Sequence, residues 1–215
     1  MNIILELLKE FLLQIICTIV LSSFLITKLH TTIRSKSIGI KNIHKRGMNV
    51  KNLEKSIKKA SIIKVLAFMP YYFTFDHKEL LVNKVREGCS LQFLACNKDS
   101  LLLKELCQIE RHVDNDIADL FDPFTNLLES IKTDAGVDTT GSIELRTYNT
   151  EIRNPVIICC DKDGKKSAFL TISMPPKRSI DAVMLEYVGD GCDSVINYFD
   201  VIWNRHSEHV ALKLK

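Results

Sequence analysis

Two aspartates, Asp161 and Asp163, lie close together after a short apolar run and are the first residues that suggest acid–base chemistry. A pair of carboxylates can divide the roles of general acid and general base. Here, however, they flank a lysine and precede Gly164, and apolar stretches adjoin the segment on both sides. This pattern is typical of a hairpin turn. We therefore predict that residues 154–173 form a strand, a tight turn and a second strand.

Polar and aromatic side chains follow two other predicted strands, at residues 61–68 and 90–96. Tyr71 comes after the first strand, and Asn97 and Ser100 come after the second. In open α/β sheets, ligands bind at the carboxyl ends of the strands. These three residues are therefore candidates for binding a nucleotide or a lipid headgroup. The alternative is that the aromatic rings after the first strand pack against a neighbouring helix.

Three basic residues are further candidates. Lys177 and Arg178 lie on a loop stiffened by two prolines and could meet a phosphate, although a solvated loop explains them as well. Arg146 lies on a predicted strand, and an inward-facing guanidinium requires an anionic partner. Asp161 is our candidate for that partner, in a structural ion pair.

The histidines and cysteines give little support for nucleophilic or metal chemistry. We expect the histidines at helix ends, in the tail or in the basic N-terminal segment, away from strand ends. The seven cysteines show none of the paired spacings of a zinc site, and their places in apolar runs are typical of a reducing compartment. Cys159 and Cys160 could form a redox pair, but one thiol on each face of a buried strand is the simpler interpretation. With no glycine-rich phosphate loop either, we expect no cofactor and no metal.

An alternation of helices and strands must position these candidates. Helical spacing at residues 50–60 precedes the strand at 61–68, and a helix separates this strand from the one at 90–96. This order predicts a parallel pair with right-handed crossovers. The later part of the chain has four more predicted strands and a closing helix: 143–148, 156–160, 168–172, 182–187 and the helix 193–206. The predicted fold class is mixed α/β, with one sheet flanked by helices.

End signals accompany two of the predicted helices. Asp76 and Glu79 are spaced as an N-terminal capping box, and Gly88 is placed to stop the same helix. Pro123 predicts a break or a new first turn within a helical stretch at 116–131.

Residues 11–26 are apolar and contain no charged side chain. A helix needs about 20 residues to span a bilayer, so the segment would extend toward Ile3 or Leu29. A cleaved signal peptide is one alternative, but the basic n-region and the cleavage site are missing. A buried globular helix is another, and apolarity on all faces disfavours it. We expect an uncleaved transmembrane helix.

Basic residues follow this segment. Residues 28–64 carry eleven Lys/Arg and one acid, Glu54. By the positive-inside rule, the C-terminal domain lies in the cytoplasm, beside the inner or plasma membrane. The same bases predict attraction to anionic lipid headgroups. Nucleic acid is the weaker candidate, because no aromatic interleaving or recognition motif accompanies the bases. The expected domains are a membrane anchor, a basic juxtamembrane linker and lead-in, and a cytoplasmic α/β domain: 1–29, 30–48 and 49–215.

The order of elements over residues 39–206 resembles one half of the phospholipase D-like fold. Three short motifs carry the resemblance: the Gly39-Ile40 opening with its basic lead-in to Arg46-Gly47, the strand SLQFLACNKDS, and the YF-x-x-x-W helix from Tyr198-Phe199 to Trp203. In this family two halves join around one site. The resemblance therefore implies that a chain with one half forms a homodimer.

The resemblance also implies where catalysis would lie. The family uses His-x-Lys followed by four residues and Asp, in which the histidine attacks phosphorus and the lysine stabilises the charge on the phosphoryl oxygens. With Asp161 in the acidic position, the histidine position falls on Asn154 and the lysine position on Val156. An amide is a poor nucleophile and valine carries no charge. We expect no phosphodiester hydrolysis by this route.

These expectations combine into one hypothesis. The chain would be a single-pass membrane protein whose catalytically degenerate phospholipase D-like domain acts as a sensor or interaction module in bacterial signalling or defence. A nucleotide or another phosphorylated ligand would be its partner. Two alternatives stay open: a membrane-associated phosphodiesterase or phospholipase with an altered site, and a plain membrane-tethered scaffold.

Overall fold

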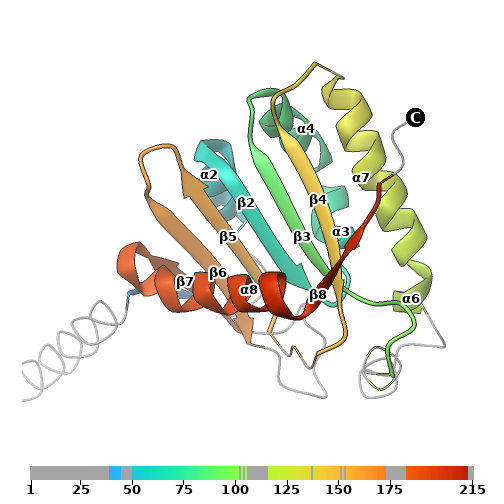
Figure 1. Ribbon diagram of the computed structural model, residues 1–215. Coiled ribbons are helices and arrows are strands. Elements are labelled where there is room, and N and C mark those ends of the chain that lie inside the picture. Colours follow the sequence, from blue (N-terminus) through green and yellow to red (C-terminus); the bar gives the residue numbers. More distant parts are fainter. Residues whose placement is uncertain are drawn as a thin grey trace, which may run out of the picture. The chain divides into compact units, whose positions relative to one another are not determined.

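A mixed eight-stranded β-sheet forms the centre of the domain (Figure 1). The computed structural model describes the following residues: 39–44, 50–101, 103, 105, 116–136, 138–150, 152, 154–172 and 183–212. The predicted transmembrane helix within residues 1–29 lies outside them. Among the described helices, none combines the length and the apolar character needed to cross a bilayer.

The strand order in the sheet is β1-β7-β6-β5-β2-β3-β4-β8. The strands are β1 (Ile40–His44), β2 (Ala60–Ala67), β3 (Ser90–Cys96), β4 (Ser142–Tyr148), β5 (Val156–Asp161), β6 (Lys166–Ile172), β7 (Val183–Val188) and β8 (Ser207–Val210). Strands β2, β3 and β4 are parallel to one another, and the remaining neighbours are antiparallel. The predicted parallel pair and the predicted hairpin of β5 and β6 are both confirmed, and so is the mixed α/β class.

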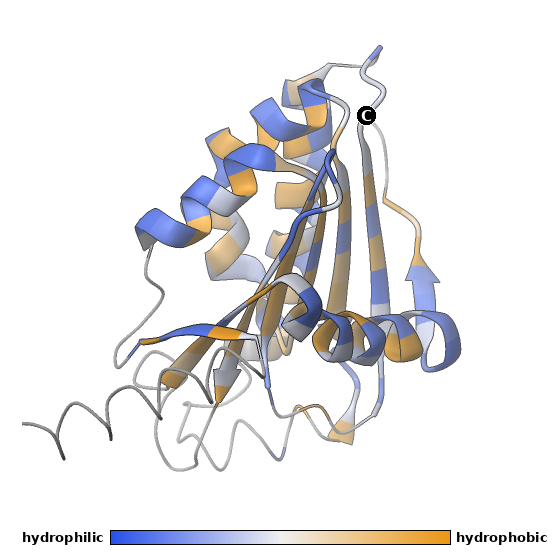
Figure 2. Cartoon of the chain, turned by 90° about the vertical axis from the view of Figure 1, so that its left-hand side faces the viewer, coloured by the Kyte–Doolittle hydropathy of each residue, from blue (hydrophilic) through white to orange (hydrophobic). Residues whose placement is uncertain are grey.

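Helices cover both faces of this sheet, as the nearly edge-on view in Figure 2 shows. They are α2 (Val50–Lys59), α3 (Tyr71–Asp76), α4 (Lys78–Arg86), α6 (Asp116–Asp119), α7 (Phe121–Ala135) and α8 (Asp193–Arg205), with a 3₁₀ turn, η2 (Gly189–Cys192), before α8. Helices α2, α3, α4 and α7 lie on one face, which we call the rear face. Helix α8 lies across the other, the front face (Figure 1).

The rear core forms because one side of the central strands and the inner stripe of the helices that cover them are apolar. Leu53 and Ile57 of α2 are fully buried, one turn apart on the same side of the helix. Phe93 of β3 meets Phe124 of α7 edge to face, with ring centroids 5.6 Å apart. Such aromatic pairs stabilise a core beyond their burial alone.

The front core lies under α8. Phe199 and Trp203, one turn apart on α8, stack at 5.5 Å between ring centroids and are buried. They belong to the same apolar cluster as Leu66 of β2 and Leu94 of β3. In Figure 1, α8 crosses the lower part of the front face. The upper part of this face, where β2 begins, has no described helix over it.

The predicted capping box at Asp76 and Glu79 is wrong. Asp76 is the last residue of α3, and the cap of α4 is His77, whose side chain makes no capping hydrogen bond. The chain turns helical earlier than predicted because Tyr71 and Phe73 pack against the rear core. The predicted stop at Gly88 is confirmed.

Gly88 ends α4 with a positive φ of 86°, a backbone conformation that glycine adopts at low cost. Its N–H donates to Val85 O at 3.1 Å, and the next N–H, of Cys89, donates to Lys84 O at 2.9 Å. Pro123 lies in the first turn of α7, as the predicted new first turn requires.

Strand β1 lies within the residues expected to be linker and lead-in. It pairs antiparallel with β7 at one edge of the sheet, with Ile43 opposite Leu185. The compact domain accordingly begins at Ile40.

Candidate functional site

The structure brings three of the predicted site residues to one edge of the sheet, where β2 and β3 end. Tyr71 begins α3 after β2, and Asn97 and Ser100 follow β3. The two strand ends are joined by a hydrogen bond from Cys96 N–H to Phe68 O at 2.9 Å. The predicted placement at the carboxyl edge is therefore confirmed for these residues.

The polar groups at this edge mainly shape the turn after β3. The Asn97 side-chain oxygen accepts the N–H of Asp99 at 3.0 Å, and the Asn97 carbonyl accepts the N–H of Ser100 at 3.0 Å. Ser100 is 9% exposed. These groups are engaged in local structure, and a ligand would have to replace that bonding.

Tyrosine side chains consolidate the same edge. The Tyr71 ring stacks with Phe75 at 5.9 Å and packs against the rear core. Tyr148 is 1% exposed and donates from its hydroxyl to Ala67 O at 3.1 Å, which joins the ends of β4 and β2. Burial raises the pKa of Tyr148 well above its ordinary value. Tyr72 and Phe75, by contrast, project into solvent, with 65% and 58% of their surface exposed.

Arg146 lies on the front face of β4 and pairs with Glu144. Its Nε donates to Glu144 Oε1 at 2.9 Å and its Nη1 to Trp203 O at 2.9 Å. The guanidinium also stacks on the Trp203 ring, 4.4 Å from the centroid. The expected anionic partner exists, but the expectation that it is Asp161 is wrong.

Asp161 lies at the far end of the sheet and shapes the β5–β6 turn. Its Oδ1 accepts the N–H groups of Asp163 at 3.0 Å and Lys165 at 2.8 Å. Gly164 completes the turn with a φ of 78°. Opposite Asp161 in the sheet is Ala60, the first residue of β2. Asp161 therefore lies where the parallel strands begin, and the Asn97 turn lies where they end. The hairpin interpretation is confirmed, and Lys177 and Arg178 lie outside the described residues.

The two other positions of the family's catalytic motif lie at the opposite end of β5 from Asp161. Val156 is fully buried in the front core, opposite Leu66. Asn154 is partly buried in a bend that precedes the strand. One β-strand therefore separates these two residues from the Asp161 carboxylate.

Sequence reasoning missed a row of charges along α8. Two cations of the sheet pair with carboxylates of α8, Lys166 with Asp193 at 2.7 Å and Lys64 with Asp200 at 2.5 Å, and beside the helix Arg146 pairs with Glu144 of its own strand β4 at 2.8 Å. The Lys64 side chain is 15% exposed, and its ammonium lies 5.3 Å from the Phe199 ring centroid. A lysine inside the apolar strand at 61–68 was the available signal, because its alternation places Lys64 on the same face as Leu66.

A second missed cluster surrounds Glu186, in the middle of β7. Its side chain is 3% exposed and receives donors from three residues of β1 and one of α2: Lys41 at 2.9 Å, Asn42 at 2.7 Å, His44 at 3.3 Å and Asn52 at 3.1 Å. We call this set the Glu186 network. Burial raises the pKa of Glu186, but hydrogen bonds from Asn42, Lys41 and Asn52 outweigh it and hold the pKa below its ordinary value. The carboxylate therefore joins β1 and α2 to the sheet.

The described cysteines behave as small apolar residues. All of them are free thiols. Cys159 packs in the rear core and Cys160 against the front core, so the two lie on opposite faces of β5 as predicted. Burial raises the pKa of Cys89 to about 11 and that of Cys192 to about 12, which leaves little reactive thiolate at neutral pH. In the described part of the chain, no three His, Cys, Asp or Glu side chains are grouped to hold a metal ion.

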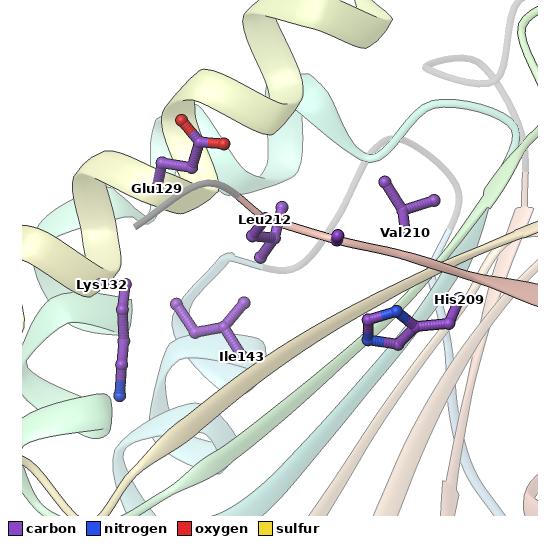
Figure 3. Close-up of a pocket in the computed structure, with 7 residues that line it drawn as sticks. Glu129, Lys132, Ile143, His209, Val210 and Leu212 are labelled. Atoms are coloured by element: carbon purple, nitrogen blue, oxygen red, sulfur yellow. The ribbon is translucent and has the colours of Figure 1, made fainter. Parts of the chain in front are cut away.

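A groove of about 280 Å³ lies between α7 and the strand β8 with the residues after it (Figure 3). Glu129 and Lys132 line it from α7, and Ile143 lines it from β4. The Lys132 ammonium donates to Gly141 O at 2.8 Å, while His209 and Leu212 line the other side. The groove is a packing seam beside an edge strand, in which few polar groups converge.

Comparisons with known proteins bear on the fold. No family model matches the chain, and no curated protein matches it. Among solved structures, the chain is similar to TrmBL2, described as an archaeal chromatin protein with a novel mode of DNA binding, at 11% identity and a TM-score of 0.50. The match covers 88% of this chain and 66% of that one, so this chain spans slightly less than two thirds of the neighbour's length. At this identity the likeness shows the fold alone.

Proposed function

We propose that this chain is a membrane-anchored, catalytically inactive phospholipase D-like protein that serves as a sensor or interaction module in bacterial signalling or defence. The membrane anchor rests on the apolar segment at residues 11–26 and the basic residues after it. The family assignment rests on the sequence resemblance over residues 39–206. The mixed sheet flanked by helices is compatible with both.

The state of the catalytic positions is the observation that carries this proposal. Val156, at the lysine position, is fully buried among apolar side chains. Asn154, at the histidine position, has an amide where a nucleophile is required. Asp161 uses its carboxylate to accept two backbone N–H groups of its own turn. Together these residues supply neither a nucleophile nor a cation for phosphoryl transfer.

A hydrolysis assay tests the loss of catalysis. The full-length protein, in detergent micelles, is incubated with phosphatidylcholine, with cyclic and linear nucleotides, and with an activated phosphodiester such as bis(p-nitrophenyl) phosphate. We expect no turnover above the buffer rate. Turnover that disappears in Asp161→Asn would overturn the proposal and favour a phosphodiesterase with an altered site.

A topology experiment tests the anchor and its orientation. A reporter that is active only in the cytoplasm, fused after Lys215, should be active, and one that is active only outside the cytoplasm should be silent. The opposite pattern would reverse the orientation. Release of the chain from membranes by alkaline carbonate would refute the anchor itself.

The homodimer is a separate part of the proposal. It follows from the family resemblance, in which two halves share one site. Light scattering of the full-length protein in detergent, corrected for bound detergent, should give twice the chain mass of 24.5 kDa. A monomer at all concentrations would contradict the dimer and leave the anchor untouched.

Two alternatives compete with a small phosphorylated ligand, namely DNA as the partner and no ligand at all. TrmBL2 is described as binding DNA, so duplex DNA is a reasonable competitor to lipid for any basic surface of this chain. A plain scaffold is the other alternative. It would be favoured if nucleotides, phosphoinositides and polyanions all failed to raise the unfolding temperature.

A further inference from the structure

The outer face of α2 is a stripe of positive charge. Four exposed lysines form it: Lys51, Lys55, Lys58 and Lys59. At 100° per residue they fall within an arc of about 100°, on the side of the helix opposite Leu53 and Ile57. Because those two residues are fully buried, the stripe points away from the core. We call it the lysine face.

The lysines of this face have no anionic partner in the described part of the chain. Most other described bases are paired, as Lys64 is with Asp200, Lys78 with Asp134 and Lys166 with Asp193. Glu54, the acid of α2, forms no ion pair with a described base. The lysine face therefore places side by side on one helix four cations that have no ion-pair partner among the described residues.

Helix stability does not explain this charge. Lysines in the last turn, Lys58 and Lys59, interact favourably with the helix dipole, but Lys51 lies in the first turn, where a cation is unfavourable. The first turn of α2 contains no acidic residue to offset it. The position of Lys51 thus costs helix stability, and an external anion would offset that cost.

The lysine face is held in a fixed orientation. Asn52 donates to Glu186 Oε2 at 3.1 Å near the start of α2, and Lys84 Nζ donates to Lys58 O at 3.1 Å near its end. Leu53 and Ile57 are buried between these two points. Because this surface is already ordered, binding an extended anionic partner costs it little further conformational entropy.

We propose that the lysine face docks the domain on an anionic membrane surface, where the four ammonium groups contact lipid headgroups. This inference rests on the proposed membrane anchor. Lysine is a compact point charge suited to a diffuse anionic surface, whereas reading nucleic acid favours arginine forks and stacking aromatic rings. The sequence of α2 contains neither arginine nor an aromatic residue.

Lysine acylation in nanodiscs tests the proposal on the full-length protein. The chain is reconstituted in discs of phosphatidylcholine alone or of phosphatidylcholine with phosphatidylglycerol, and the acylation rate of each lysine is measured by mass spectrometry. We expect the four lysines to react several-fold more slowly in the anionic discs, with the difference lost at high salt. Lys98, beyond the opposite end of the parallel strands, should react equally in both.

Charge reversal provides a matched comparison. Lys55→Glu should return Lys51 and Lys59 toward the rates seen in neutral discs, since each lysine near an anionic surface contributes about fivefold in affinity. Lys98→Glu, with the same change in net charge, should not. Equal rates in the two kinds of disc, or equal effects of the two variants, would overturn the proposal.

Two further outcomes separate this inference from its rivals. Duplex DNA that protects the same lysines in neutral discs better than phosphatidylglycerol does would assign the face to nucleic acid and overturn the membrane partner. Flotation after alkaline carbonate reports on the anchor alone. A chain that loses its membrane attachment in carbonate, yet shows lipid-dependent protection of the four lysines, would refute the anchor and keep the lysine face.

Discussion

Asp161 and Glu186 are two carboxylates of the same antiparallel part of the sheet, and they serve opposite purposes. Asp161 accepts N–H groups from residues two and four positions ahead, so its effect is confined to one turn. Glu186 accepts hydrogen bonds from residues 134 to 145 positions away, so it holds together elements that are distant in sequence. The first shapes the chain locally, and the second closes the fold.

Burial explains why losing the Glu186 carboxylate should destabilise the fold more than losing the Asp161 carboxylate. Without its carboxylate, the turn at Asp161 can give its two N–H groups to water. The donors around Glu186 belong to a site where the acceptor is 3% exposed, and water reaches it poorly. Removing the charge there takes away the shared acceptor of several part-buried donors, which costs more than losing an exposed hydrogen bond.

Glu186→Gln should give the largest loss of stability. The amide keeps the shape of the side chain but loses the charge and one acceptor that serve Lys41, Asn42 and Asn52. We expect the free energy of unfolding to fall by about 3 kcal/mol, measured by denaturant titration of the full-length protein. A loss no larger than that of Asp161→Asn would contradict the distinction between the two carboxylates.

Arg146→Ala tests an intermediate case. It removes the ion pair to Glu144, the bond to Trp203 O and the stacking on the Trp203 ring. We expect a loss of about 2 kcal/mol, with Arg146→Lys recovering only part of it because lysine lacks the planar fork. Full recovery by lysine would show that charge alone matters at this position.

Asp161→Ala should have a smaller effect. The two turn N–H groups lose an exposed acceptor, for an expected loss of about 1 kcal/mol, again read from denaturant titration. Asp161→Asn keeps Oδ1 and serves as the control, with an expected loss near zero. An equally large loss in the control would mean that the negative charge, and not the acceptor, supports the hairpin.

The smallest expected effect is a pH dependence centred on Glu186. Its pKa is lower in the folded protein than in the unfolded chain, so the stabilisation is fully present above the unfolded value. It is lost as the pH falls through the folded value. The stability difference between wild type and Glu186→Gln should therefore shrink from neutral pH toward about pH 4 and below. A difference that stays constant over this range would show that the charge of Glu186 contributes nothing.

Local features of the fold could be predicted from the sequence. The strand at 90–96 was predicted to the residue, because its apolar run is bounded by a glycine-containing stop and the Asn97 turn. The hairpin was predicted for the same reason, because the turn residues Asp161 to Gly164 separate two apolar runs. The capping box failed because the spacing of Asp76 and Glu79 says nothing about the packing of Tyr71, which starts a helix five residues earlier.

The long-range features could not be predicted in this way. The polar residues of β1 are typical of a linker when the sequence is considered alone. Their role becomes clear only in the structure, where Glu186 lies beside them. Glu186 itself gave a signal, a glutamate at an inward position of an apolar strand, but not the identity of its donors. For Arg146, the need for an anion was predicted correctly and the partner was not, although the alternation of a strand places Glu144 on the same face as Arg146.

The pairing of the first strand with one of the last has a consequence for synthesis on the ribosome. His44 precedes Glu186 by 142 residues, and at about 5–20 residues per second the interval is on the order of ten seconds. During that time β1 has left the ribosome and its partner strand does not yet exist. An unpaired apolar strand would be prone to aggregate, and the lysine, asparagine and histidine of β1 protect it. We expect the polar side chains of β1 that later bind Glu186 to limit aggregation of the nascent chain until β7 has been made.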